Sequence, residues 1–235
     1  MKPLPQILDA LESYYGAQRP AAPVDPYLFL VWWHCGYPPS QERCARGFAA
    51  LQEEVGSAAQ ELLAVPARRL ARVLASGGIV PQVRAARLKE VARRVSEDFS
   101  GDLKSALQRL PLTQARMALK KFPGIGAPGA DRILLFARIA PLAAVPSSCP
   151  HVLVRIQSGA EPDAYSAGYA CAQAALERLP RDCESRIRAY LLLQRHGREL
   201  CRRGAPRCEL CPVARSCAFI RQAADRRRTS RPQRR

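Results

Sequence analysis

The sequence predicts an all-α protein, and three of its features lead to this fold class. Strand signals are nearly absent, because β-branched residues are sparse and alternating apolar runs are lacking. Ala, Leu, Arg, Glu and Gln dominate, with apolar positions at intervals of three and four residues. Proline or glycine separates most of these stretches. With 235 residues, 48% of them hydrophobic, the chain can form one large domain or two compact ones.

Each expected helix is a stretch with apolar residues at helical spacing, bounded by helix-breaking residues. The first runs from Ile7 to Tyr14, and prolines then precede Asp25, which can cap a buried helix that ends near Gly36. Further helices are expected at 40–55, 57–64, 66–76, 81–99, 103–110, 113–121, 129–139, 163–179 and 181–195. No internal repeat is visible. Residues 221–235 form a basic end with almost nothing to bury, which predicts a disordered tail.

The charge favours a polyanionic partner. Thirty-seven Lys and Arg against 20 Asp and Glu give a formal net charge of +17. Nucleic acid is the leading partner, and an anionic membrane surface is the rival. No apolar run approaches the roughly 20 residues that span a bilayer, and MKPLPQILDALESYYG lacks a signal-peptide core. We therefore expect a cytoplasmic, nucleoid-associated protein whose basic tail either is solvated or tethers DNA.

The nine cysteines fall into two groups. Five are scattered and are expected to be small buried residues with reduced thiols: Cys35, Cys44, Cys149, Cys171 and Cys183. Four crowd together with the spacing C-x6-C-x2-C-x5-C, at Cys201, Cys208, Cys211 and Cys217. Only one CxxC is present, whereas zinc more often uses two, so the spacing predicts that these four cysteines hold a [4Fe–4S] cluster, with zinc as the alternative.

The loop that carries these cysteines is also basic. A bound cluster would hold it rigid and present Arg202, Arg203 and Arg207, whose guanidinium groups suit phosphate contacts. The segment 112–137, LTQARMALKKFPGIGAPGADRILLFA, fits two helices joined by a tight turn, with Thr113 as a cap. By itself, PGIG also fits a simple interhelical turn.

In this hairpin the glycines permit a sharp turn that brings backbone N–H groups close to an anion, and the next helix adds its dipole. Two lysines add charge beside the turn. The expected DNA contacts of the hairpin are Lys120, Lys121, Phe122, Pro123, Gly124, Ile125 and Gly126.

The hairpin, QRHGRELC (194–201) and the cysteine spacing together resemble the endonuclease III family of helix-hairpin-helix DNA glycosylases, over roughly residues 25–219. The resemblance implies two helical domains that flank a DNA-binding cleft, and a monomer that binds double-stranded DNA. The expected organisation is an N-terminal helix (1–23) that packs on the cluster domain, a helical domain (24–135), the C-terminal helices with the cluster loop (136–220), and the tail.

Two positions that carry the family's chemistry are occupied by proline. The family pattern resembling PGVGxKTA reads PGIGAPGA, which places Pro128 at the catalytic lysine. The pattern resembling AVDxxxxRVxxR reads AVPSSCPHVLVRI, which places Pro146 at the catalytic aspartate. We therefore assign no catalytic residue. Asp131 is expected to be a cap or a salt-bridge partner, and the acids nearest in sequence after it, Glu161 and Asp163, are expected in a solvated loop.

A third family position is the wedge that enters the duplex when a base flips. The segment HCGYPPS corresponds to the family's LxSQxTxD and puts Tyr37 there, where it could stack in the gap, with an ordinary buried aromatic as the alternative. Trp32 and Trp33 are expected in the core, because they lie inside an apolar helix.

These residues favour an iron–sulfur DNA-binding protein of base-excision repair that recognises damaged or distorted duplex without lysine-dependent lyase chemistry. One alternative is a glycosylase of altered mechanism that removes easily lost bases, such as alkylated purines. The other is an iron–sulfur redox sensor anchored on DNA. Loss of two cooperating catalytic groups, each worth about 10² to 10⁴ in rate, favours the first reading.

Overall fold

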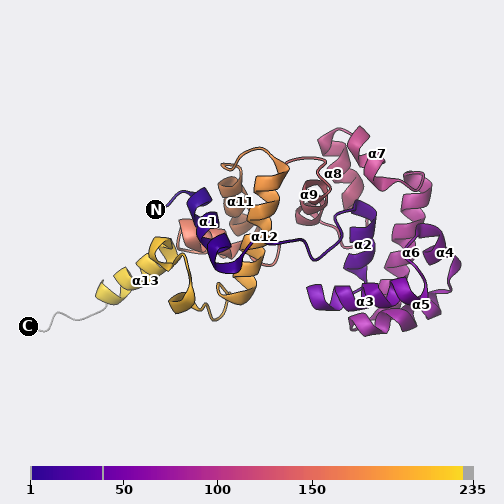
Figure 1. Ribbon diagram of the computed structural model, residues 1–235, viewed down its shortest axis with the longest axis horizontal. Helices are drawn as coiled ribbons and strands as arrows, with labels where there is room; N and C mark the ends of the chain where they lie inside the picture. Colours follow the sequence, from indigo (N-terminus) through magenta and orange to yellow (C-terminus); the bar gives the residue numbers. More distant parts are fainter. Residues whose placement is uncertain (1, 39, 230–235) are drawn as a thin grey trace, which may run out of the picture. The chain divides into compact units, whose positions relative to one another are not determined.

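The computed structural model describes residues 2–38 and 40–229, and its elements are all helical (Figure 1). The predicted all-α fold class is confirmed. The described chain divides into two compact units: unit 1 comprises Met1–Arg19 and Pro141–Arg235, and unit 2 comprises Pro20–Ala140. No helix within the described residues is both long and apolar enough to cross a bilayer.

Unit 2 contains the helices from the middle of the chain. They are α2 (Pro26–His34), α3 (Gln41–Glu54), α4 (Ala59–Ala64), α5 (Ala67–Leu74), the 3-10 helix η1 (Ala75–Gly77), α6 (Pro81–Asp98), α7 (Leu103–Arg109), α8 (Leu112–Lys120) and α9 (Ala127–Phe136). Asp25 caps α2 as predicted, since its carboxylate accepts a hydrogen bond from Leu28 N at 3.0 Å. The core of this unit is formed where α4 and α5 pack against α6, while α3 packs against α5 and α2.

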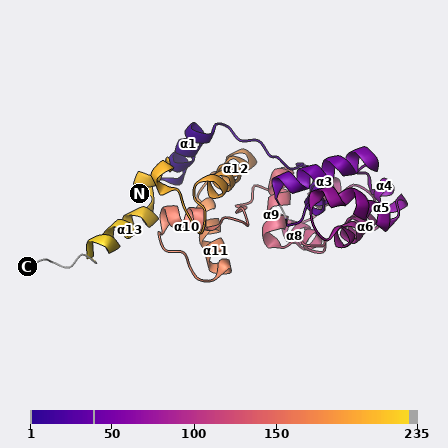
Figure 2. The same ribbon diagram turned by 90° about the horizontal axis from the view of Figure 1, so that it is seen from below.

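Unit 1 joins the two ends of the chain. Its helices are α1 (Leu4–Tyr15), α10 (His151–Gln157), α11 (Tyr165–Leu176), α12 (Cys183–Glu199), the 3-10 helices η2 (Cys208–Leu210) and η3 (Ala214–Ser216), and α13 (Ala218–Thr229). Figure 2 shows α10 between α11 and α13. The helix α1 packs against α12, where Arg188 reaches both Asp9 and Glu12 and the Tyr15 hydroxyl lies 3.0 Å from His196 Nδ1.

The structure differs from the sequence expectations at four places. The short helix α10 was not predicted, because residues 151–156 are all buried and leave no exposed polar face, and the helix follows two prolines. Residues 221–229, expected as disordered tail, continue α13, whose first turns include Phe219 and Ile220 packed against the core; residues 230–235 lie outside the described residues. Pro111, not Thr113, precedes α8. Two of the scattered cysteines, Cys171 and Cys183, are half-buried, while the other three are buried.

Candidate nucleic-acid interface and metal centre

The segment 112–137 forms the predicted helix-hairpin-helix in unit 2. The turn between α8 and α9 is closed by hydrogen bonds from Phe122 N to Leu119 O (3.1 Å) and from Ile125 N to Phe122 O (3.2 Å). Gly124 has a φ of +68°, which favours glycine. Phe122 and Ile125 are buried, whereas the two glycines and the two lysines of the turn are exposed. The apolar side chains therefore anchor the turn and leave its backbone open to solvent.

The first turn of α9 presents unused backbone donors. Gly126 begins the helix and, among the described residues, no side chain caps it. The turn contains no acidic residue, and the positive end of the helix dipole is therefore available to an anion. Pro128 lies in this same turn, where its missing N–H removes no intrahelical bond. The position at which the family carries its lysine is thus structurally suited to proline.

Asp131 is engaged within the hairpin. Its carboxylate forms a two-point ion pair with Arg116, with Arg116 Nε 2.6 Å from Oδ1 and Nη2 3.1 Å from Oδ2, and its side chain is only 6% exposed. The salt-bridge interpretation is therefore the correct one. The pair ties α8 to α9 and occupies the carboxylate.

The turn rests on the end of α2. A Cβ atom added at Gly124 would lie 3.7 Å from His34 Cε1 and 3.8 Å from Trp33 Nε1. His34 is buried, and the Pro123 carbonyl accepts a hydrogen bond from its ring, while its Nε2 has no partner within the described chain. Burial, followed by the nearby Arg87, lowers the pKa of His34 to about 4, so the ring is neutral at pH 7. Trp32 is buried as expected, and Trp33 is half-buried.

Tyr37 lies just after α2 and is 42% exposed, so it is not an ordinary buried aromatic. Its backbone pairs with the loop that follows η1, with hydrogen bonds from Tyr37 N to Gly77 O (3.1 Å) and from Ile79 N to Tyr37 O (3.0 Å). In the segment that follows η1, Ile79, Val80 and Val83 are all more than 40% exposed. Sequence reasoning found Tyr37 but missed these three exposed apolar residues, which the run GGIVPQV could have indicated.

We call Tyr37 and Ile79 the exposed apolar tip, and the buried Arg84 holds their backbone in place. Its guanidinium donates to four backbone carbonyls at 2.7 to 3.0 Å: Cys35, Leu74, Gly78 and Ile79. Gly77 completes the close packing, because a Cβ there would lie 1.8 Å from Cys35 O. The end of α2 and the loop after η1 therefore form one rigid support for Tyr37 and Ile79.

The four clustered cysteines line one cavity in unit 1. Cys201, Cys208, Cys211 and Cys217 share this space with Arg155, His196 and apolar side chains. In the described chain, no group of three or more His, Cys, Asp or Glu side chains gathers closely enough to hold a single metal ion. Zinc would need its thiolates at about 2.3 Å from one ion, whereas in a cubane each thiolate meets a different iron. The four thiols thus line one space in the described chain without forming a single-ion site.

Two polar side chains lie close to the thiols. Arg155 Nη1 lies 3.8 Å from Cys201 Sγ, and His196 Nε2 lies 3.6 Å from Cys211 Sγ. Burial raises the pKa of Cys211 to about 11 and also raises the pKa of Cys201 and Cys208. Burial therefore favours the neutral thiol form of these three cysteines.

Arg155 links the cysteine loop to α10 and was missed from the sequence, although the segment AVPSSCPHVLVRI was singled out. Its side chain is 5% exposed and donates to the carbonyls of Arg202 and Arg203, both at 2.8 Å, and to Glu161 Oε1 at 2.5 Å. Glu161 is thus paired with a buried cation, not held in a solvated loop. The side chains of Arg202, Arg203 and Arg207 are exposed around this anchor.

Pro146 is buried in the segment that leads into α10, and its carbonyl accepts a hydrogen bond from Cys149 N at 3.0 Å. The next residue, Ser147, is exposed, and its carbonyl accepts from the Tyr165 hydroxyl at 3.1 Å. Asp163 lies near by, in a shallow pocket on α10 and α11 that His151 also lines. The position at which the family carries its aspartate thus has a backbone role here.

No protein-family model matches this chain, and no curated protein matches it. A non-covalent endonuclease III–DNA complex superposes with a TM-score of 0.72 at 19% identity, covering 96% of this chain and 100% of that chain. A thermostable thymine-DNA glycosylase gives a TM-score of 0.72 at 19% identity, covering 93% of this chain and 96% of that chain.

A third solved structure is more distant. The H. pylori 3-methyladenine DNA glycosylase (MagIII) bound to 1,N6-ethenoadenine gives a TM-score of 0.54 at 17% identity, covering 94% of this chain and 97% of that chain. The chain therefore shares its fold with endonuclease III and with the thymine-DNA glycosylase over nearly its whole length.

Proposed function

We propose that this protein binds double-stranded DNA at damaged or distorted sites without lysine-dependent lyase chemistry. The observation that carries the proposal is the hairpin, which offers an anion its exposed backbone while Pro128 stands in the first turn of α9. Lys120, Lys121 and the residues 122–126 would contact phosphates. The net charge of +17 adds long-range attraction.

The exposed apolar tip would recognise distorted duplex DNA. Tyr37 and Ile79 project from a support braced by Arg84, so they can enter a gap in the base stack without first losing much conformational freedom. Entry of apolar side chains costs least where the stack is already disturbed. A bulge, a mismatch or an abasic site should therefore bind more tightly than intact duplex.

The cysteine loop would hold a [4Fe–4S] cluster through Cys201, Cys208, Cys211 and Cys217. The cluster would act as a structural brace that fixes Arg202, Arg203 and Arg207 for phosphate contacts, beside the anchor supplied by Arg155. Iron and sulfide analysis of the purified protein tests this part, with about four of each expected per chain. Zinc in their place would refute it.

Binding is tested by fluorescence anisotropy with labelled duplexes that differ only at a central site, which is intact, mismatched, bulged or abasic. The proposal predicts tighter binding to the distorted duplexes, and an affinity that falls steeply with salt. Equal affinity for all four duplexes would refute the recognition of distortion.

A glycosylase of altered mechanism is the second candidate, favoured by the similarity to the 3-methyladenine enzyme bound to ethenoadenine. Alkylated purines leave easily, so a shaped pocket has less of the barrier to lower. Release of the free base from 3-methyladenine duplex would support this candidate over pure binding.

A further inference from the structure

Two contacts in series connect α1 to one of the four clustered cysteines. The Tyr15 hydroxyl lies 3.0 Å from His196 Nδ1, and the second nitrogen of the same ring, Nε2, lies 3.6 Å from Cys211 Sγ. All three residues belong to unit 1, where α1 packs against α12 (Figure 1). The first helix of the chain is therefore joined through His196 to the cysteine loop near its other end.

The position of His196 is fixed by the end of α12. The residue is only 1% exposed, and its backbone carbonyl accepts hydrogen bonds from Leu200 N at 3.0 Å and from Cys201 N at 2.8 Å. These two N–H groups lie where the helix passes into the cysteine loop. The imidazole is thus held beside Cys211 by the same backbone that starts the loop.

Tyr15 is fixed from its other side. Its ring packs edge to face against Tyr14 with centroids 4.8 Å apart, and the guanidinium carbon of Arg195 lies 5.4 Å from its centroid. The ring also meets the imidazole of His196 edge to face, with centroids 6.0 Å apart. The hydroxyl is therefore held at His196 Nδ1 by packing on three sides.

The direction of both hydrogen bonds follows from the state of Cys211 when metal is bound. A metal-bound cysteine is a thiolate, which has no proton to donate. The hydrogen bond to Cys211 Sγ must then come from the N–H at His196 Nε2. In a neutral imidazole the other nitrogen is an acceptor, so Nδ1 accepts from the Tyr15 hydroxyl. Tyr15 thereby selects the tautomer that directs an N–H at the sulfur.

We propose that His196 and Tyr15 are positioning residues of the metal centre, and that the His196 N–H stabilises the metal-bound thiolate of Cys211. The inference rests on the cluster of the proposed function, and the donor set suits such a group, since four cysteine sulfurs line one cavity. A hydrogen bond to a ligand sulfur offsets part of its negative charge. It should therefore slow the loss of the metal and raise the reduction potential of the cluster.

Three variants test these contacts atom by atom. Tyr15→Phe removes only the hydroxyl, and His196→Leu removes both hydrogen bonds while keeping an apolar side chain of similar size. His196→Gln keeps an amide N–H that can replace the lost donor. The matched control is Tyr14→Phe, which removes the hydroxyl of the neighbouring, 52% exposed tyrosine. Circular dichroism establishes that each protein is folded.

Two properties are measured on each purified protein with its cluster. The first is the rate at which an iron chelator removes the visible absorbance, which should rise about tenfold in His196→Leu and less in Tyr15→Phe. The second is the reduction potential measured by voltammetry, which should fall in both variants. Tyr14→Phe should match the wild type, and His196→Gln should recover part of the potential. If His196→Leu fails to fold or to hold iron, Tyr15→Phe decides.

The potential distinguishes this role from simple packing. A potential that is unchanged in Tyr15→Phe and His196→Leu would overturn the inference even if iron were lost faster, and the iron and sulfide of the wild type would still support the cluster. Zinc in the wild type would refute the cluster of the proposed function. The inference would then stand if Tyr15→Phe released zinc to a chelator faster than Tyr14→Phe, and fall if the two rates were equal. A wild type without metal would refute both.

Discussion

Replacing Arg155 with methionine should destabilise unit 1 and loosen the cysteine loop. Methionine keeps much of the aliphatic volume but removes the bonds to the carbonyls of Arg202 and Arg203 and the ion pair with Glu161. Removal of one partner from a buried pair costs about 3 to 5 kcal/mol. Because Glu161 keeps 27% of its side-chain surface in solvent, we expect the lower end, about 3 kcal/mol.

That loss can be measured by thermal unfolding followed by circular dichroism. For a chain of this size, about 3 kcal/mol corresponds to a fall in Tm of roughly 6 to 12 °C. The iron content of the purified Arg155→Met protein should fall as well, since the carbonyls that Arg155 binds flank Cys201 in the loop. The matched control is Arg195→Met, whose 2.8 Å pair with Glu199 is exposed on α12 and should cost about 0.5 kcal/mol. An Arg155→Met protein as stable and as iron-rich as this control would refute the reasoning.

Three further predictions concern unit 2. Arg84→Met leaves four backbone carbonyls without their donor and should lower the free energy of unfolding by about 3 kcal/mol or more. The control Arg87→Met, at an exposed position, should change the urea midpoint little. Gly124→Ala places a side chain at a φ of +68°, so it should lower the free energy of unfolding by about 1 kcal/mol and weaken duplex binding. Gly126→Ala, at a φ of −95°, should leave the fold intact. Equal losses of stability in the two variants would contradict this. His34 takes up a proton below about pH 6.5 in the unfolded state but only near pH 4 in the folded state. As the pH is lowered from 6.5 to 4, the free energy of unfolding should therefore fall by at most about 1.4 kcal/mol per pH unit. His34→Gln should make this fall, measured by urea titrations, less steep.

The sequence was sufficient for the fold class and the hairpin because both depend on local signals. The period of apolar residues and the glycines of PGIG determine helices and turn with little help from distant contacts, and Asp25 caps its helix through its own neighbours. Asp131 was expected to be either a cap or a salt-bridge partner, and it pairs with Arg116 in the structure.

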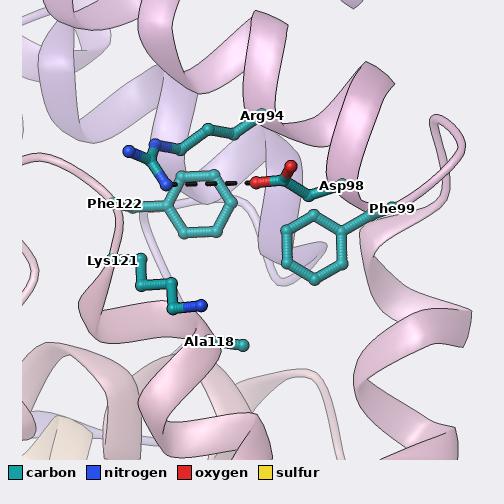
Figure 3. A pocket seen from close by; sticks show the side chains of 6 residues that line it. All are labelled: Arg94, Asp98, Phe99, Ala118, Lys121 and Phe122. Atoms are coloured by element: carbon teal, nitrogen blue, oxygen red, sulfur yellow. Dashed lines mark ion pairs between the residues drawn. The ribbon is translucent and has the colours of Figure 1, made fainter.

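What the sequence missed depends on contacts between distant segments. Arg155 meets carbonyls 47 and 48 residues away, and Arg84 meets one 49 residues away, which no local pattern reveals. The contact between the rings of Phe99 and Phe122 likewise joins the end of α6 to the end of α8 (Figure 3). The helix α10 lacks a polar face because it is buried on all sides, so its periodicity gave no signal.

The most direct measurement of the central claim is borohydride trapping on duplex that carries an abasic site. The wild type should bind this duplex and give no covalent adduct, because proline has no nucleophile. The double variant Pro128→Lys and Pro146→Asp restores the family's two groups, and position 128, in the first turn of α9, accepts lysine without losing a hydrogen bond. An adduct from the double variant alone is the result we predict. An adduct from the wild-type protein would contradict the account.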